Sequence, residues 1–170
     1  AVGAQTGAAS VFTEEAADAY ALNAAYTADK YAISLTYGVV EATNAAGALT
    51  DEEDKFTAIN AYYTPDAEGL PSISVGYEFG DIGGAAAGAD EQASFMVGLT
   101  WDEIGPGSAG VALGHSNTNE NADELYQYEA YYEYPVNDSM TVTPLIYTLD
   151  AAGANTDDTS GAMVKTTFTF

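Results

Sequence analysis

The chain has 170 residues and a formal net charge of −23, with 26 Asp and Glu against three Lys and no Cys. The lack of a basic face argues against nucleic acid as a partner, and the lack of Cys excludes disulfides and thiolate chemistry. Because 47% of the residues are nevertheless hydrophobic, the acids and the apolar residues must be segregated within one domain spanning 1–170.

Alternation of apolar and polar residues predicts nine β-strands. They cover 19–27, 31–39, 56–64, 72–80, 94–101, 109–115, 125–134, 140–149 and 162–170. A tenth strand at 8–13 is an alternative that the pattern leaves open. A tilted strand crosses a bilayer with about 9–11 residues, which is the length of most of these runs, and no stretch reaches the roughly 18 apolar residues of a membrane-spanning helix.

The connections between these strands alternate in predicted length. Long segments are expected at 1–18, 41–54, 80–92, 116–124 and 150–161, and short ones at 28–30, 65–71, 102–108 and 135–139. Outer-membrane barrels have long external loops and short periplasmic turns. We therefore expect 1–18 to be an external loop or leader and 19–170 to carry the strands of a barrel wall.

The acids are predicted to lie mostly in these connections. Three of the 26 are expected inside strands, namely Glu78, Glu129 and Glu133, on the face opposite the aromatic residues. Lys165 shares that face. A sheet between lipid and water requires this segregation. The residues predicted to line a water-filled pore are Glu78, Gln127, Glu129, Glu133, Lys165 and Thr167, and the carboxylates would favour cations over anions.

The aromatic residues on the other face fall into two groups, as amphipathic rings at the two membrane interfaces would. The predicted interface aromatics are Tyr20, Tyr26, Tyr31, Tyr77, Phe79, Trp101, Tyr126, Tyr132, Tyr134, Phe168 and Phe170. The closing residue, Phe170, is expected to anchor the last strand at the periplasmic boundary.

The segment 128–170 resembles the C-terminal end of cyanobacterial-type outer-membrane porins of the carbohydrate-selective (OprB-like) family. An aromatic strand, a "VND" turn, a "TVTP" strand and a final "TTFTF" carry the resemblance. The matching positions are Tyr131, Tyr132, Val136, Asp138, Thr143, Pro144, Thr166, Thr167, Phe168 and Phe170. The segment 70–80 resembles an interior strand of the family, whereas Lys165 stands where family members usually carry Arg.

The resemblance implies an antiparallel transmembrane β-barrel of about sixteen strands, preceded by a surface-layer-type domain and a periplasmic coiled coil. Because nine or ten strands are predicted here, we expect an all-β fold that forms the C-terminal part of such a barrel.

Catalysis is not expected. His115 has no Ser, Cys or metal partner at useful spacing, and Glu129 and Glu133 lie about 13 Å apart along a strand, whereas paired glycosidase carboxylates need about 5–9.5 Å. No cofactor is implied. Weak divalent binding at Asp51, Glu52, Glu53 and Asp54 is an alternative to a simply solvated acidic surface.

The sequence therefore predicts a bacterial outer-membrane porin for passive diffusion of small hydrophilic solutes or ions. Sugars and inorganic cations both remain open as solutes. The expected partners are outer-membrane lipid or lipopolysaccharide, the solutes themselves and further copies in a homotrimer. The alternative is a secreted all-β surface or adhesion module, a sandwich or fibre subunit.

Overall fold

The computed structural model describes residues 18–43, 48–85, 89–119, 122–151 and 157–170. It contains nine β-strands: β1 (Ala19–Thr27), β2 (Tyr31–Thr43), β3 (Leu49–Tyr63), β4 (Ser72–Asp81), β5 (Glu91–Ile104), β6 (Gly107–Asn119), β7 (Tyr126–Asn137), β8 (Met140–Leu149) and β9 (Thr159–Phe168). The suggested strand at 8–13 lies outside the described residues. No helix in these ranges is long and apolar enough to cross a membrane.

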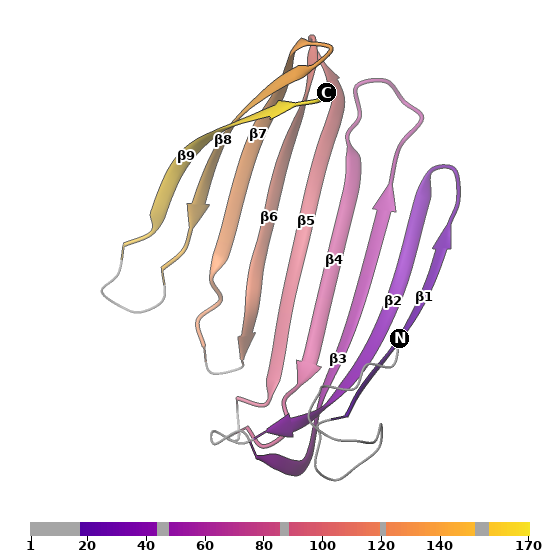
Figure 1. The fold of residues 1–170 in the computed structure, drawn as a ribbon, viewed down its shortest axis with the longest axis vertical. Coiled ribbons are helices and arrows are strands. Elements are labelled where there is room, and N and C mark those ends of the chain that lie inside the picture. Colours follow the sequence, from indigo (N-terminus) through magenta and orange to yellow (C-terminus); the bar gives the residue numbers. More distant parts are fainter. Residues whose placement is uncertain (1–17, 44–47, 86–88, 120–121, 152–156) are drawn as a thin grey trace.

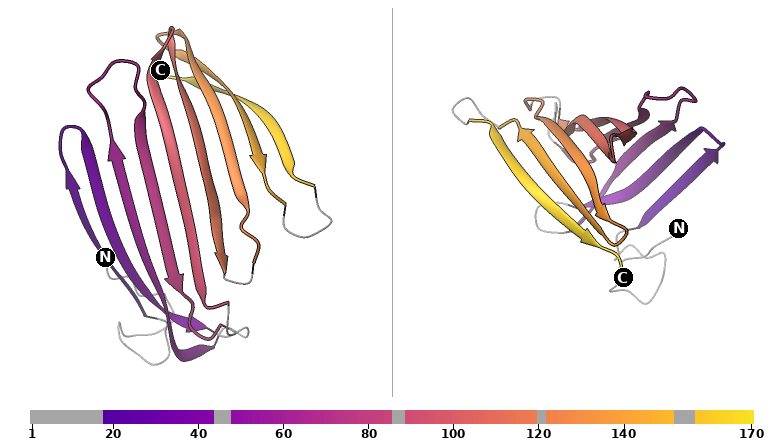
Figure 2. Two further views of the ribbon diagram at one scale, coloured as in Figure 1. Left: turned by 180° about the vertical axis from the view of Figure 1, so that it is seen from behind. Right: turned by 90° about the horizontal axis from the view of Figure 1, so that it is seen from above.

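The strands form one antiparallel sheet in chain order, so each strand pairs with its sequence neighbours (Figure 1). Tyr, Val, Ile and Thr populate these segments because such side chains pack well on a pleated surface. Strands β1 and β9 form the two edges of the open sheet. Seen along the strands, the sheet is arched, with β5 and β6 near the crest and β1 and β9 on opposite flanks (Figure 2).

Several strands extend further than the sequence predicted. The expected loop at 41–54 is mostly strand, because Glu41 pairs with Glu53 and Thr43 with Leu49 across a bulge. The expected turn at 102–108 is reduced to 105–106, where Gly105 has a φ of 62°. Such a φ suits glycine in a two-residue hairpin loop. Similarly, β6 continues to Asn119 into the expected loop at 116–124.

The connections fall at two ends of the sheet, which we call the loop end (44–48, 82–90, 120–125 and 150–158) and the turn end (28–30, 64–71, 105–106 and 138–139). The predicted strict alternation in length is wrong at one hairpin, since 64–71 is longer than 44–48. The two-residue turn at 138–139 is closed by Asn137, whose Oδ1 accepts a hydrogen bond of 2.9 Å from the Ser139 amide.

The predicted distribution of acids also needs correction. The longer strands include further acidic residues: Glu41, Asp51, Glu52, Glu53, Asp54, Asp81, Glu91, Asp102 and Glu103. These residues lie toward the strand ends, because backbone pairing continues past the point where the apolar alternation stops. Apolar alternation therefore gave the bounds of β1 and β8 but underestimated the ends of β2, β3, β5 and β6.

The sheet has almost no hydrophobic core of its own. Among the described residues, Val39 and Ala42 are the buried hydrophobic ones. Large apolar side chains are exposed instead, including Leu22 at 72%, Ile146 at 63% and Val164 at 66%. Apolar exposure on this scale marks a surface that another phase or partner covers.

Candidate functional site

The pairing register assigns every strand residue to one of two faces, because directly opposed residues point to the same side of a sheet. The face that carries Leu35, Ile59 and Tyr77 on adjacent strands is called the aromatic face. The face that carries Ala58, Glu78 and Ser94 is called the polar face. The register also orients β3, whose two sides could not be distinguished from the sequence.

The aromatic face contains the predicted interface aromatics of the strands. Tyr26, Tyr31, Trp101, Tyr132, Tyr134 and Phe168 lie on it toward the turn end, and Tyr20, Tyr77, Phe79 and Tyr126 toward the loop end. Phe170 follows β9 and stacks on Phe168 with ring centroids 6.5 Å apart. Two hydroxyls on this face reach polar groups at the strand ends: Tyr132 donates to the Ile104 carbonyl at 2.7 Å, and Tyr126 to Glu124 at 2.6 Å.

Charge does reach the aromatic face at its loop end, which the sequence pattern did not show. Lys55 is paired in register with Val39 on one side and Asp81 on the other, and Asp81 pairs with Glu91. The Lys55 ammonium lies 3.4 Å from a carboxylate oxygen of Glu53. The middle of this face is uncharged, so the apolar band is bounded by charge at the loop end.

All six predicted pore-lining residues lie on the polar face. Glu78 is opposite Ser94, and Gln127 and Glu129 are opposite Leu149 and Tyr147. The remaining members of the set are Glu133, opposite Ser108, Thr167, opposite Thr141, and Lys165, opposite Thr143. The register therefore brings these side chains from three strands, β4, β7 and β9, onto one surface.

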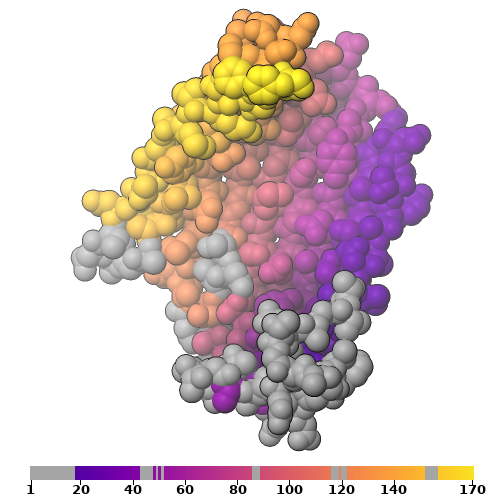
Figure 3. Space-filling view, viewed as in Figure 1, coloured from indigo at the N-terminus to yellow at the C-terminus, as the bar shows by residue number. Residues whose placement is uncertain are grey.

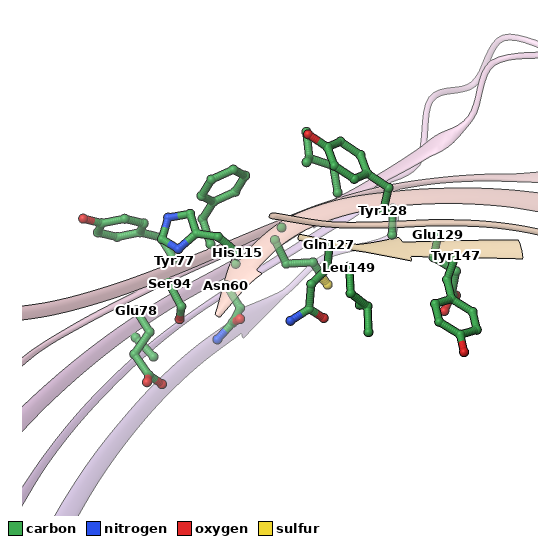
Figure 4. A pocket seen from close by; sticks show the side chains of 17 residues that line it. Asn60, Tyr77, Glu78, Ser94, His115, Gln127, Tyr128, Glu129, Tyr147 and Leu149 are labelled. Atoms are coloured by element: carbon green, nitrogen blue, oxygen red, sulfur yellow. The ribbon is translucent and has the colours of Figure 1, made fainter. Parts of the chain in front are cut away.

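The polar face is the hollowed side of the arch. Figure 3 shows the sheet from this side, with β1 and β9 at opposite flanks. An open depression of about 840 Å³ is lined mainly by polar-face residues, which include Asn60, Glu78, Ser94, Gln127 and Glu129, together with some aromatic-face residues such as Tyr77 and His115. In Figure 4 the side chains of Asn60, Glu78, Ser94 and Gln127 point to one side of the sheet, whereas Tyr77, His115 and Tyr128 lie on the other.

Four aromatic residues on the polar face were missed by the sequence reasoning. They are Phe56, Tyr62, Tyr131 and Tyr147. Phe56 and Tyr62 belong to the run whose faces looked alike, and Tyr147 follows Pro144, which interrupts the alternation in β8. A signal that could have found three of the four rings is a glycine directly opposite the ring on the neighbouring strand.

These three rings occupy the space that a side chain would fill on the neighbouring strand. A Cβ added to Gly110 would lie 2.4 Å from the Tyr131 ring, one on Gly161 would lie 2.5 Å from the Tyr147 ring, and one on Gly80 would lie 2.8 Å from the Phe56 ring. Glycine therefore allows each ring to lean over the adjacent strand instead of standing up into the hollow. This arrangement keeps the polar face open while it still carries aromatic surface.

The sheet offers no arrangement suited to catalysis within its described ranges. His115 lies on the aromatic face, with its ring 4.7 Å from Phe95 and 5.8 Å from Tyr126 in edge-on contacts. The described residues include no group of three or more His, Asp and Glu placed to hold a metal ion. Glu53 and Asp54 are successive residues of β3, so they point to opposite faces, and Asp54 accepts a 2.9 Å hydrogen bond from the Gly83 amide.

The comparison with protein families matches residues 75–170 to the carbohydrate-selective porin, OprB family. The chain belongs to this family. It is therefore a porin of the bacterial outer membrane and not an enzyme, and its nine-stranded sheet is part of a β-barrel wall. Comparisons with curated proteins and with solved structures found no match.

The family match covers β5 to β9 and most of β4, including the six polar-face residues named above. Strands β1, β2 and β3 precede the matched segment, yet the register carries the same two faces through them, from Tyr77 to Ile59, Leu35 and Ala24. The porin therefore continues one wall pattern across all nine strands.

Proposed function

We propose that the polar face lines a water-filled channel through which small neutral sugars and cations diffuse across the outer membrane. The single observation that carries this proposal is the division of one sheet into an apolar, exposed face and a polar, hollowed face with no core between two layers. Only a wall with lipid on one side and water on the other satisfies both faces at once.

The aromatic face would contact lipid. Its middle carries aliphatic side chains such as Leu35, Val75 and Val97, and its rings gather toward both strand ends, where amphipathic aromatics prefer the headgroup region. In this orientation the turn end is periplasmic and the loop end external, where acids could meet lipopolysaccharide through divalent cations. The homotrimer remains a prediction.

The wall would be completed by further strands, because β1 and β9 each pair on one side and a strand edge cannot remain open in lipid. We therefore propose, as the sequence predicted, that the nine strands are part of a larger barrel; the predicted external segment at 1–18 lies almost wholly outside the described residues.

The acids of the polar face would make the channel favour cations. Glu78, Glu129 and Glu133 face the hollow against one cation, Lys165. Fixed carboxylates raise the local concentration of cations in a narrow aqueous path, and salt screens this effect beyond about 10 Å at 0.1 M. The passage of neutral sugars would not depend on this attraction to the carboxylates.

The test is ion selectivity of the intact porin in planar bilayers under a KCl gradient. We expect a reversal potential that indicates K⁺ preference, a smaller potential when Glu78, Glu129 and Glu133 are all replaced by Gln, and a larger one for Lys165→Gln. An anion preference in the native porin would contradict the acidic channel, and the absence of any conductance would contradict the pore itself.

A further inference from the structure

We propose that a groove on the aromatic face holds one acyl chain of lipopolysaccharide in a fixed position. The inference deepens the proposed function and rests on its placing of the loop end outside. The groove has a volume of about 730 Å³ and crosses the sheet from β5 to β9. Its lining comes mainly from the aromatic face and includes Val97, Val111, Ala130 and Ile146.

The small side chain of Ala130 forms the floor of the groove. Ala130 of β7 is directly opposite Val111 of β6 and Ile146 of β8. Both neighbours stand out from the sheet, since Val111 is 42% exposed and Ile146 is 63% exposed. Because β-branched side chains have few χ1 rotamers, these two walls keep their shape. The groove is therefore a lasting feature of the surface.

One end of the groove carries a pair of hydroxyls. Thr148 Oγ1 and Ser160 Oγ lie 3.0 Å apart and share a hydrogen bond, and both residues line the groove. Each hydroxyl has one proton and two acceptor lone pairs, so one proton remains for a further acceptor after the two have bonded to each other. In a wall that faces lipid, the carbonyl and hydroxyl oxygens of the lipid are such acceptors.

The hydroxyl pair lies at the depth where lipids carry these oxygens. Thr148 is two residues from Asp150, whose amide donates a hydrogen bond of 2.9 Å to the Tyr126 carbonyl. Tyr126 belongs to the interface aromatics of the loop end, and a rise of about 3.4 Å per residue places Thr148 about 7 Å closer to the middle of the bilayer. The linkages between acyl chains and headgroups occupy this boundary, so the apolar part of the groove meets the hydrocarbon and the hydroxyls meet the linkages.

The shape of the sheet favours a lipid chain over a second copy of the porin as the occupant. The aromatic face is the convex side of the arch (Figure 2), and two convex walls meet only along a narrow strip. A flexible chain follows a convex wall and restores the packing contacts that an empty groove lacks. Water does not take its place, because apolar hollows stay dry.

The position of the hydroxyl pair identifies the lipid. In the proposed orientation the loop end is external, and the lipid of the external leaflet is lipopolysaccharide. Its acyl chains are joined to sugar through ester and amide carbonyls, and several carry a hydroxyl close to that linkage. Thr148 and Ser160 match this chemistry, whereas the phospholipids of the inner leaflet meet the turn end.

The experiment measures the affinity of the intact porin in detergent for rough-type lipopolysaccharide by native mass spectrometry in the presence of EDTA. EDTA removes divalent bridges to the acids of the loop end, so the lipid that is retained reports the groove. We expect Ala130→Phe to lower the affinity about tenfold, because the ring occupies the space of a few CH₂ groups of the chain. Thr148→Val keeps the branched shape, removes one hydroxyl and should lower the affinity about threefold.

Each of these two variants tests one part of the proposal. Unchanged affinity in Ala130→Phe would overturn the groove, and unchanged affinity in Thr148→Val would overturn the pairing of the lipid with the hydroxyls. Heat-modifiable migration on a gel shows whether each variant folds. If Ala130→Phe does not fold, the nearly isosteric Thr148→Val decides the proposal alone.

The matched control is Ala61→Phe. Ala61 lies on the aromatic face of β3, opposite Ile33 and Val75, and does not line the groove. The affinity of this variant should stay within about twofold of the native value. Equal losses in Ala61→Phe and Ala130→Phe would overturn the site.

Two further outcomes would assign the groove to another occupant and overturn the proposal. Phosphatidylethanolamine should bind at least about tenfold more weakly than lipopolysaccharide, and equal binding of the two lipids would contradict the lipid named here. A loss of oligomers in Ala130→Phe with unchanged binding of lipopolysaccharide would assign the groove to a second copy.

The conductance of the porin in bilayers made of phospholipid alone separates this inference from the pore itself. A porin that conducts there but binds no lipopolysaccharide in detergent would refute the groove and leave the proposed function intact. Binding that is lost in Ala130→Phe would support the groove even if no current flows.

Discussion

The two faces of the sheet use aromatic residues in opposite ways. On the aromatic face, several rings are opposed by bulky side chains, as where Tyr26 faces Ile33 and Tyr37 faces Leu22. On the polar face, Tyr131 and Tyr147 are opposed by Gly110 and Gly161. The comparison shows that a glycine across the strand pair leaves room for a ring to lie over the neighbouring strand.

The difference has a physical cause in what lies beyond each face. A ring that projects into lipid gains apolar contact along its whole length, and its hydroxyl can reach the headgroup region. A ring that projects into a channel would block the path and expose apolar surface to water. Glycine on the neighbouring strand removes this conflict, at the usual cost in backbone entropy.

The largest expected effect on the free energy of unfolding comes from a single charge placed at the middle of β5, on one face in one variant and on the other face in a second variant. Val97 and Met96 are adjacent in sequence and lie on the aromatic and polar faces, opposite Leu113 and Gly114. Val97→Arg should reduce the free energy of unfolding by about 2–4 kcal/mol, since a cation at the bilayer midplane is poorly solvated, whereas Met96→Arg should cost less than about 1 kcal/mol.

Urea unfolding in lipid vesicles, followed by Trp101 fluorescence, measures both values. The comparison of faces fails if the two Arg variants lose similar stability, or if Met96→Arg proves to be the more damaging of the two.

A smaller effect is expected at the glycines. Gly110→Ala would place a methyl group 2.4 Å from the Tyr131 ring, so we expect a loss of about 1–2 kcal/mol as the ring is displaced. Gly98→Ala on the same face meets its nearest atom at 3.9 Å and should instead gain about 0.5 kcal/mol from lower chain entropy. The same unfolding assay in vesicles measures the loss of stability in Gly110→Ala and the gain in Gly98→Ala. Equal effects of the two substitutions would show that the position of the Tyr131 ring does not depend on Gly110.

Much of the wall could be predicted from the sequence because apolar alternation directly reports which side chains meet lipid. The runs 31–39, 72–80 and 162–170 were each predicted to carry their aromatic residues on one face, and the register places the aromatic residues of these strands on one face of the sheet. Several strand ends could not be predicted in this way, since residues such as Glu53 and Asp81 are polar yet pair through their backbones, and backbone pairing leaves no mark in the side-chain pattern.

The candidate site was predictable only in part, for a related reason. Glu78, Glu129 and Lys165 stand out as charges within alternating runs. Tyr147 does not, because its role depends on Gly161, which is fourteen positions away in sequence and becomes its neighbour through the register of β8 and β9. Strand register thus carries information about the site that alternation within one strand does not.

The most direct test of the central claim measures whether each face of the sheet contacts lipid or water. The chain has no Cys, so single Cys variants at Val97 and Met96 can carry nitroxide labels without background. In lipid vesicles we predict that the label at 97 is more accessible to oxygen, which concentrates in the hydrocarbon, and that the label at 96 is more accessible to a water-soluble nickel chelate. Two labels with the same preference for the aqueous reagent would contradict the assignment of lipid to the aromatic face and water to the polar one.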